Sequence, residues 1–132
     1  MIYLASPYSH PDPLVRKTRF LLAEQATAIL LNQGIFTFSP IVHCHALAER
    51  HTIPTDFAFW RGYNFDMLRR ADLVSVLAIP GWKESVGVQA EIEMARAIGM
   101  QVTFINEMGE PYYEKLRSTS DGQSNSLGRS EG

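Results

Sequence analysis

The sequence predicts an α/β fold, because short apolar runs alternate with longer segments in which apolar residues recur at helical spacing. Two apolar runs stand out, residues 2–5 and 73–79, and each is typical of a strand buried on both faces of a sheet. Their alternation with helices favours parallel strands joined by right-handed crossovers. We therefore expect a small doubly wound (Rossmann- or flavodoxin-like) parallel sheet of four or five strands with helices on both faces.

The first helix carries the clearest boundary signals. Residues 2–5 form the first expected strand, and residues 6–11 form a loop. Asp12 is then an expected N-cap, with Pro13 at the first helical position, where its missing N–H costs no hydrogen bond. Apolar residues recur at helical spacing from there to Gly34, which is typical of a helix C-terminus.

The middle of the chain is expected to be less regular. Residues 35–39 alternate and are rich in β-forming residues, so they predict a second strand. Residues 40–54 are expected to be irregular, with a short helix near residues 46–50. The remaining expected elements are a helix at 56–70, a strand at 73–79, a helix at 89–98 and a strand at 102–106.

Residues 1–117 are expected to form one domain, followed by a disordered tail at 118–132 that has almost nothing to bury. The net charge of −2 gives no support for a nucleic-acid partner, which would favour a basic surface. No apolar run is long enough to cross a membrane, and the N-terminus lacks the features of a secretory signal. Cys44 is the only cysteine, which excludes an internal disulfide and favours a reducing cytoplasm.

Ligands of doubly wound sheets bind outside the carboxyl ends of the strands. This rule brings together three segments: Ser6–His10, Ser39–His45 and Pro80–Gly87. The third segment opens a helix, whose free N–H groups favour an anionic ligand. Glu91 lies early in that helix, where the helix dipole favours its ionised form. We therefore interpret Glu91 as an active-site carboxylate, and a solvated surface Glu is the alternative.

Asp66 is the second candidate acid. It lies near the C-terminal end of the expected helix at 56–70, one turn after Tyr63, where the helix dipole disfavours an ionised carboxylate. Two carboxylates with opposite tendencies are what chemistry with a nucleophile and an acid requires. An ion pair of Asp66 with Arg69 or Arg70 is the alternative.

Three aromatic residues lie at or near strand ends. Tyr8 and Trp82 fall in expected loops, where a large ring is suited to wall a pocket and to stack on a flat heterocycle. Tyr3 lies in the first strand, where core packing is the alternative to contact with a substrate.

A metal site is not expected. His43, Cys44, His45 and His51 lie close together in the sequence, but their spacing fits no strong zinc pattern, and no second pair of ligands stands out. The sequence also has no Walker motif, GxSxG elbow or GxGxxG fingerprint.

Three segments together resemble the nucleoside 2-deoxyribosyltransferase superfamily over about residues 1–106. The first is Ile-Tyr-Leu-Ala-Ser-Pro at residues 2–7, a strand that leads into a loop of small residues. The second is the Asp in Tyr-Asn-Phe-Asp-Met-Leu at residues 63–68, which precedes Ala-Asp-Leu at 71–73. The third is a Ser, a Gly two residues later and a Glu four residues after that Gly, within residues 85–91.

The resemblance implies roles for individual residues. Glu91 matches the nucleophile, and Asp66 matches the Asp that contacts the sugar or assists the leaving base. Ser85 stands where the transferases have Asp and where the 2′-deoxynucleoside 5′-phosphate N-hydrolases have a phosphate-binding Ser. The chain is therefore more similar to that hydrolase branch, within a smaller bacterial and phage group. Gly87 and Ser6 would help to hold the phosphate or the sugar hydroxyls.

The expected function is cleavage or transfer at the N-glycosidic bond of a (deoxy)nucleoside or its 5′-monophosphate, through a glycosyl-enzyme intermediate on Glu91. This chemistry needs neither a cofactor nor a metal. The expected partner is a small nucleoside or nucleotide rather than a nucleic-acid polymer or a membrane. The resemblance also implies a homodimer or larger homo-oligomer. The alternative is a non-catalytic nucleotide-binding or sensing module that uses the same cleft.

Overall fold

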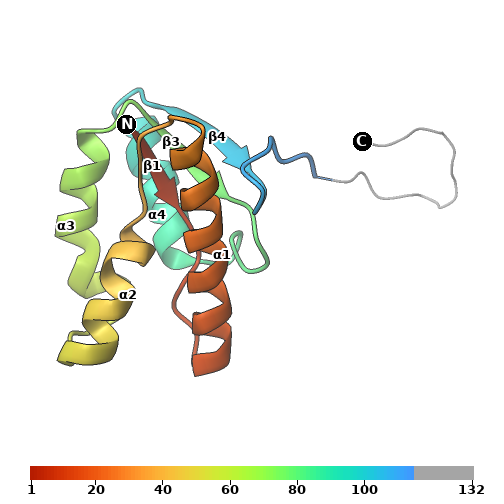
Figure 1. Cartoon of the computed structure of the whole chain (residues 1–132). Helices are drawn as coiled ribbons and strands as arrows, with labels where there is room; N and C mark the ends of the chain where they lie inside the picture. Colours follow the sequence, from red (N-terminus) through yellow and green to blue (C-terminus); the bar gives the residue numbers. More distant parts are fainter. Residues whose placement is uncertain (115–132) are drawn as a thin grey trace, which may run out of the picture.

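A four-stranded parallel sheet forms the centre of the molecule (Figure 1). The computed structural model describes residues 1–114, so the expected tail at 118–132 lies outside the described residues. The strands are β1 (Ile2–Ala5), β2 (Thr37–Phe38), β3 (Leu73–Leu77) and β4 (Gln101–Ile105). They are arranged in the order β2-β1-β3-β4, with all pairs parallel. The predicted α/β fold class is confirmed.

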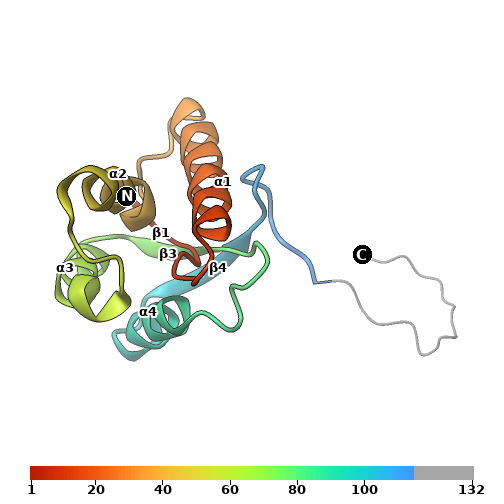
Figure 2. The same ribbon diagram turned by 90° about the horizontal axis from the view of Figure 1, so that it is seen from below.

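Helices cover both faces of this sheet, as the view from below shows (Figure 2). The helices are α1 (Pro13–Asn32), α2 (Pro40–His51), α3 (Phe57–Arg69) and α4 (Val86–Ala97). α1 packs on one face, where Ile41 and Val42 of α2 join the same apolar cluster. α3 and α4 pack on the other face. This two-sided covering is the doubly wound arrangement that the alternating sequence pattern predicts.

The predicted start and end of the first helix are confirmed. Asp12 caps α1 by accepting a hydrogen bond from the Leu14 N–H at 2.9 Å, and Pro13 is the first helical residue. Gly34 follows the helix with a φ of +80°, a conformation that residues with a side chain rarely adopt.

Residues 40–51 form a full helix, so the expectation of an irregular segment is wrong. Ser39 caps α2 by accepting a hydrogen bond from the Val42 N–H at 3.1 Å, and Pro40 occupies the first helical position. This is the same pair of start signals that marks α1. The second strand is shorter than expected, and α4 begins at Val86 rather than at residue 89.

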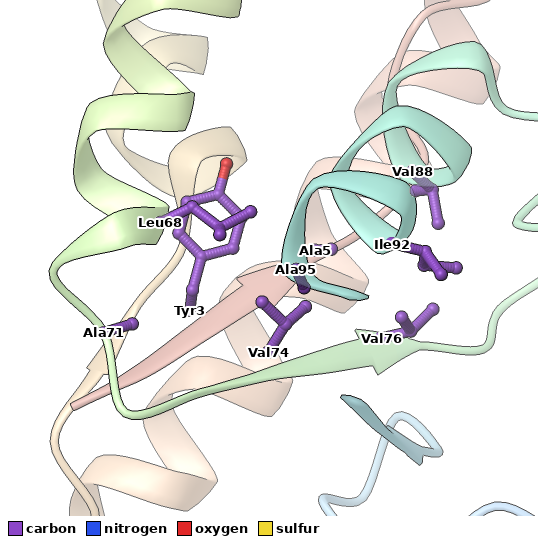
Figure 3. Close-up of a cluster of buried hydrophobic side chains, with 9 residues drawn as sticks. All are labelled: Tyr3, Ala5, Leu68, Ala71, Val74, Val76, Val88, Ile92 and Ala95. Carbon is purple, nitrogen blue, oxygen red and sulfur yellow. The ribbon is translucent and has the colours of Figure 1, made fainter. Parts of the chain in front are cut away.

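β1 lies between β2 and β3 and sends alternate side chains to opposite faces. Tyr3 and Ala5 enter the cluster beneath α3 and α4, which Figure 3 shows, and Leu4 enters the cluster beneath α1. The ring of Tyr3 rises from β1 toward these helices and is fully buried. The middle of β1 is therefore a rigid platform for any group that contacts Tyr3.

The strand order creates one switch point. From β1 the chain crosses to β2 on one side, whereas β3 and β4 lie on the other side. The loops that follow β1 and β3 therefore diverge, and such a divergence is where doubly wound sheets bind ligands. Between residues 1 and 114, no helix is both long and apolar enough to cross a lipid bilayer.

Candidate functional site

Glu91 lies on the face of α4 that is turned toward the sheet, and its exposed fraction is 4%. One carboxylate oxygen, Oε2, accepts a hydrogen bond from the Tyr3 hydroxyl at 2.6 Å. The other neighbours on this helix face are the apolar residues Val88, Ile92 and Ala95. A carboxylic acid therefore lies inside an apolar layer with one side-chain hydrogen-bond donor.

Burial changes the pKa of this acid. It raises the pKa of Glu91 from 4.5 to about 7, although the Tyr3 hydrogen bond acts in the opposite direction. Burial, and then the negative charge of Glu91, also raises the pKa of Tyr3. Tyr3 therefore stays protonated and acts as the donor. α4 begins at Val86, so Glu91 lies in its second turn, where burial opposes the ionisation that the helix dipole was expected to favour.

A pocket of about 210 Å³ opens beside the N-terminus of α4. Its walls come from the loop after β1, from the N-terminal part of α3 with the residues before it, and from the start of α4. The lining residues are Tyr8, Ser9, Thr55, Asp56, Phe57, Trp60, Asn64, Glu84, Ser85, Val86 and Gly87. Of the three segments predicted to meet at this edge, those around residues 6–10 and 80–87 line the pocket, and Ser39–His45 lies behind it, where His45 contacts Tyr8.

Asn64 is a pocket residue that our sequence reasoning missed. Its exposed fraction is 6%, and its Oδ1 has no hydrogen-bond partner among residues 1–114. Buried polar atoms are rarely left unpaired, so such an atom beside a pocket indicates a position for a ligand donor. The helical spacing of Trp60, Asn64 and Leu68, which form the buried face of α3, would have identified it.

Asp66 lies away from this buried face. Its side chain is 49% exposed, and its carboxylate pairs with Arg69 at 3.1 Å and with Arg70 at 3.3 Å. Two residues after Asn64, a side chain points to a different side of the helix. Asp66 therefore forms the ion pairs that were given as the alternative to a catalytic role. In the described part of the chain it neither lines the pocket nor contacts Glu91.

Ser85 and Gly87 both line the pocket and also have structural roles. Ser85 caps α4 by accepting a hydrogen bond from the Val88 N–H at 3.2 Å. A Cβ atom added at Gly87 would lie 3.1 Å from the Phe57 ring, so this position has little room for a side chain. Ser6 is buried directly after β1, and its Oγ also has no hydrogen-bond partner in the described part of the chain, although Ser6 is not part of the pocket wall.

The two aromatic residues expected to wall the pocket have different positions. Tyr8 does line it, and its hydroxyl forms a 2.6 Å hydrogen bond with His45 Nδ1. The His45 ring in turn stacks on Phe20 with the ring centroids 4.1 Å apart. Trp82 lies elsewhere, because its ring packs against Phe104 of β4, with centroids 5.2 Å apart. Trp82 therefore does not contribute to this pocket.

The histidines of α2 do not converge on one point. His43 is exposed and stacks on Tyr63, His45 is buried beside Tyr8, and His51 is exposed at the end of the helix. Burial raises the pKa of the Cys44 thiol to about 11. Within residues 1–114, no three His, Cys, Asp or Glu side chains are placed to hold a metal ion.

Residues 1–107 match the family described as "Domain of unknown function (DUF1937)". The chain belongs to this family. The DUF1937 match ends two residues after β4, so it includes all four strands and helices, Glu91 and every residue that lines the pocket. No curated protein matches this DUF1937 chain.

Ser85 is expected to contribute to the stability of this DUF1937 domain as a helix cap. Ser85→Ala should lower the free energy of unfolding by about 1 kcal/mol, because the Val88 N–H loses its acceptor. Ser85→Asp should retain wild-type stability, because Asp is an equally good cap. Urea unfolding of the three proteins tests this, and equal losses in both variants would contradict the capping role.

Asp66→Asn is expected to have little effect on either stability or activity. The pairs with Arg69 and Arg70 are half exposed, so their loss should cost about 1 kcal/mol or less. Turnover per folded molecule should stay at the wild-type level, since Asp66 does not line the pocket. Thermal unfolding and turnover should be measured on the same preparation. A large loss of turnover in a variant of normal stability would show that Asp66 belongs to the candidate site.

Proposed function

We propose that this DUF1937 protein cleaves or exchanges the N-glycosidic bond of a (deoxy)nucleoside or its 5′-monophosphate, with Glu91 as the nucleophile. The observation that carries the proposal is the Glu91 carboxyl group, which is buried, bonded to Tyr3 and placed next to a pocket at the switch point of the sheet. The resemblance to the nucleoside 2-deoxyribosyltransferase superfamily supplies the reaction type.

Glu91 and the pocket are neighbours along one face of α4. Gly87 lines the pocket, and Glu91 follows four residues later, so the two lie one above the other on the helix. Gly87 has no side chain, and the Phe57 ring lies close to where its Cβ would be, so the Phe57 ring would have to turn for a ligand in the pocket to reach Glu91, which does not itself line the pocket. With that ring turned, a sugar bound in the pocket could bring its anomeric carbon toward the carboxylate.

The reaction would proceed in two displacements at this carbon. In the first, the ionised Glu91 carboxylate forms a bond to C1′, and the N-glycosidic bond breaks with its electron pair passing to the base, which takes up a proton from solvent water. In the second, water or another base attacks C1′ and gives up a proton to solvent, and the bond between C1′ and Glu91 breaks with its electron pair returning to the carboxylate. Tyr3 would hold one carboxylate oxygen in place and favour the ionised form, which leaves the other oxygen for attack.

Asn64 takes the second polar role that the sequence pattern gave to Asp66. Its amide lines the pocket, where it can bind a sugar hydroxyl or an amino group of the base. An amide has no acidic proton, so Asn64 would position the substrate without protonating the leaving base. No cofactor or metal enters this mechanism.

Chromatography of nucleosides and nucleoside monophosphates after incubation with the protein tests the function directly. Release of free base supports an N-glycosidase, and formation of a new nucleoside in the presence of a second base supports a transferase. Binding without any product after long incubation would instead support the non-catalytic sensing module. The proposed setting is the cytoplasm, with the protein as a homo-oligomer, which light scattering of the purified protein would test.

A further inference from the structure

The pocket beside α4 has a negative rim. Asp56 and Glu84 both line it, and no Lys, Arg or His side chain does. Neither acid has a cationic partner among the ion pairs of residues 1–114. The nearest cation in the sequence, Lys83, is paired with Glu114 instead.

Two helix N-termini oppose this charge, because Asp56 caps α3 and Ser85 caps α4. The Arg19 guanidinium lies behind the wall, where it donates to the Ser9 carbonyl oxygen. A helix N-terminus carries roughly half a positive elementary charge. The two carboxylates carry two full negative charges, and the Ser85 hydroxyl is already bonded to the Val88 N–H. On the wall itself the two carboxylates outweigh the partial charges of the two helix N-termini, so this wall disfavours an anion.

Asn64 adds a specific requirement for the ligand. Its Oδ1 is buried and lacks a donor among the residues that the structure describes, and leaving a buried acceptor unpaired is costly. A ligand that fills the pocket must therefore present a hydroxyl or amino hydrogen at this point. A phosphate group, ionised at neutral pH, offers acceptor oxygens instead.

The aromatic walls are held in place before any ligand binds. The Trp60 indole N–H donates to the Pro54 carbonyl oxygen at 2.8 Å, and the Tyr8 hydroxyl is bonded to His45. Together with Phe57, these rings give the pocket flat apolar surfaces that suit a heterocycle or the face of a sugar ring.

We infer that this pocket selects an uncharged nucleoside, with Asn64 accepting a hydrogen bond from it, and that Asp56 and Glu84 exclude the 5′-monophosphate. This inference rests on the proposed function and narrows its substrate class. It also opposes the preference for a phosphate that Ser85 suggests when the sequence is considered alone.

Equilibrium dialysis with 2′-deoxyadenosine and 2′-deoxyadenosine 5′-monophosphate tests the inference. The host is the full-length Glu91→Gln chain, which removes turnover, at low ionic strength and at a pH where the phosphate is dianionic. The nucleoside should bind at least about tenfold more tightly than the monophosphate, because like charges repel strongly at a partly dehydrated site.

Two variants and one control assign this preference to the pocket. Adding Asp56→Asn and Glu84→Gln together should reduce the ratio of the two dissociation constants about tenfold, and Asn at position 56 still caps α3. Glu93→Gln removes one negative charge from an exposed position outside the pocket and should leave this ratio unchanged. Asn64→Leu, which keeps the volume without the amide, should weaken nucleoside binding about tenfold or more.

The outcomes separate this inference from the proposed function. The inference would be overturned if the monophosphate bound as tightly as the nucleoside or more tightly, or if neither compound bound. It would also be overturned if the double variant left the ratio of the two dissociation constants unchanged. Base release by the wild-type protein with no preference against the monophosphate would overturn the inference alone. Binding in the expected order without base release from any nucleoside would overturn the proposed function and leave the inference standing.

Discussion

Glu91→Gln is expected to reduce the release of base by at least about 10⁴-fold, because removal of a covalent nucleophile eliminates the chemical step. Gln has nearly the same shape as Glu and can still accept the hydrogen bond from Tyr3, so the fold should be retained. Turnover by chromatography and the circular dichroism spectrum should be measured on the same sample. Glu93→Gln is the matched control, since Glu93 is exposed on the same helix. A Glu91→Gln protein with the wild-type rate would exclude this mechanism.

The pH dependence of the wild-type rate provides a second test of the nucleophile. Because the pKa of Glu91 is raised to about 7, kcat/KM should rise about tenfold per pH unit below pH 7 and level off above it. Tyr3→Phe removes a hydrogen bond that favours the ionised form, so the rise should shift to higher pH. A rate that is flat from pH 5 to 8 would show that Glu91 does not have to ionise.

Glu91→Gln is also expected to stabilise the protein at neutral and alkaline pH. Glu91 ionises near pH 4.5 in the unfolded chain but only near 7 in the folded one. Its contribution to stability is therefore fully present below pH 4.5, declines as the pH rises, and is lost above about pH 7. Gln does not ionise, so Glu91→Gln should exceed wild type by about 3 kcal/mol in free energy of unfolding at pH 8.

Urea unfolding of both proteins between pH 5 and 8 measures this effect. The difference between the two free energies should be smallest at pH 5 and should grow toward pH 8. The Glu93→Gln control should show no such growth, because Glu93 is exposed. A constant difference across the range would mean that Glu91 is not the buried ionisable group that limits stability. Loss of turnover together with this gain would identify an acid kept for function at the cost of stability.

Local signals in the sequence were sufficient for the element order and for the start of α1. Asp12 with Pro13 marks the start of α1 through a side-chain acceptor for a free N–H and a residue that needs no acceptor. Ser39 with Pro40 carries the same information for α2, which the expectation of an irregular segment overlooked. These effects act within one helical turn, so they can be recognised from neighbouring residues alone.

The buried face of α3 could also be predicted from neighbouring residues in the sequence. Trp60, Asn64 and Leu68 recur every four residues, and this spacing places Asn64 rather than Asp66 beside the pocket. Asp66 was the expected site residue because a carboxylate can act as an acid, which an amide cannot. Side-chain direction depends on helical spacing, however, and this spacing directs Asn64 toward the pocket and Asp66 away from it.

By itself, the sequence determined the α/β class, the cap of α1 and the choice of Glu91 as the acid to examine. Only the tertiary structure decided the strand order, the negative rim of the pocket and the raised pKa of Glu91. Tyr3 meets Glu91 across 88 positions of the chain, and the rim joins Asp56 to Glu84. Burial and electrostatic fields depend on which distant segments come together, whereas caps and helical faces depend on neighbours along the chain.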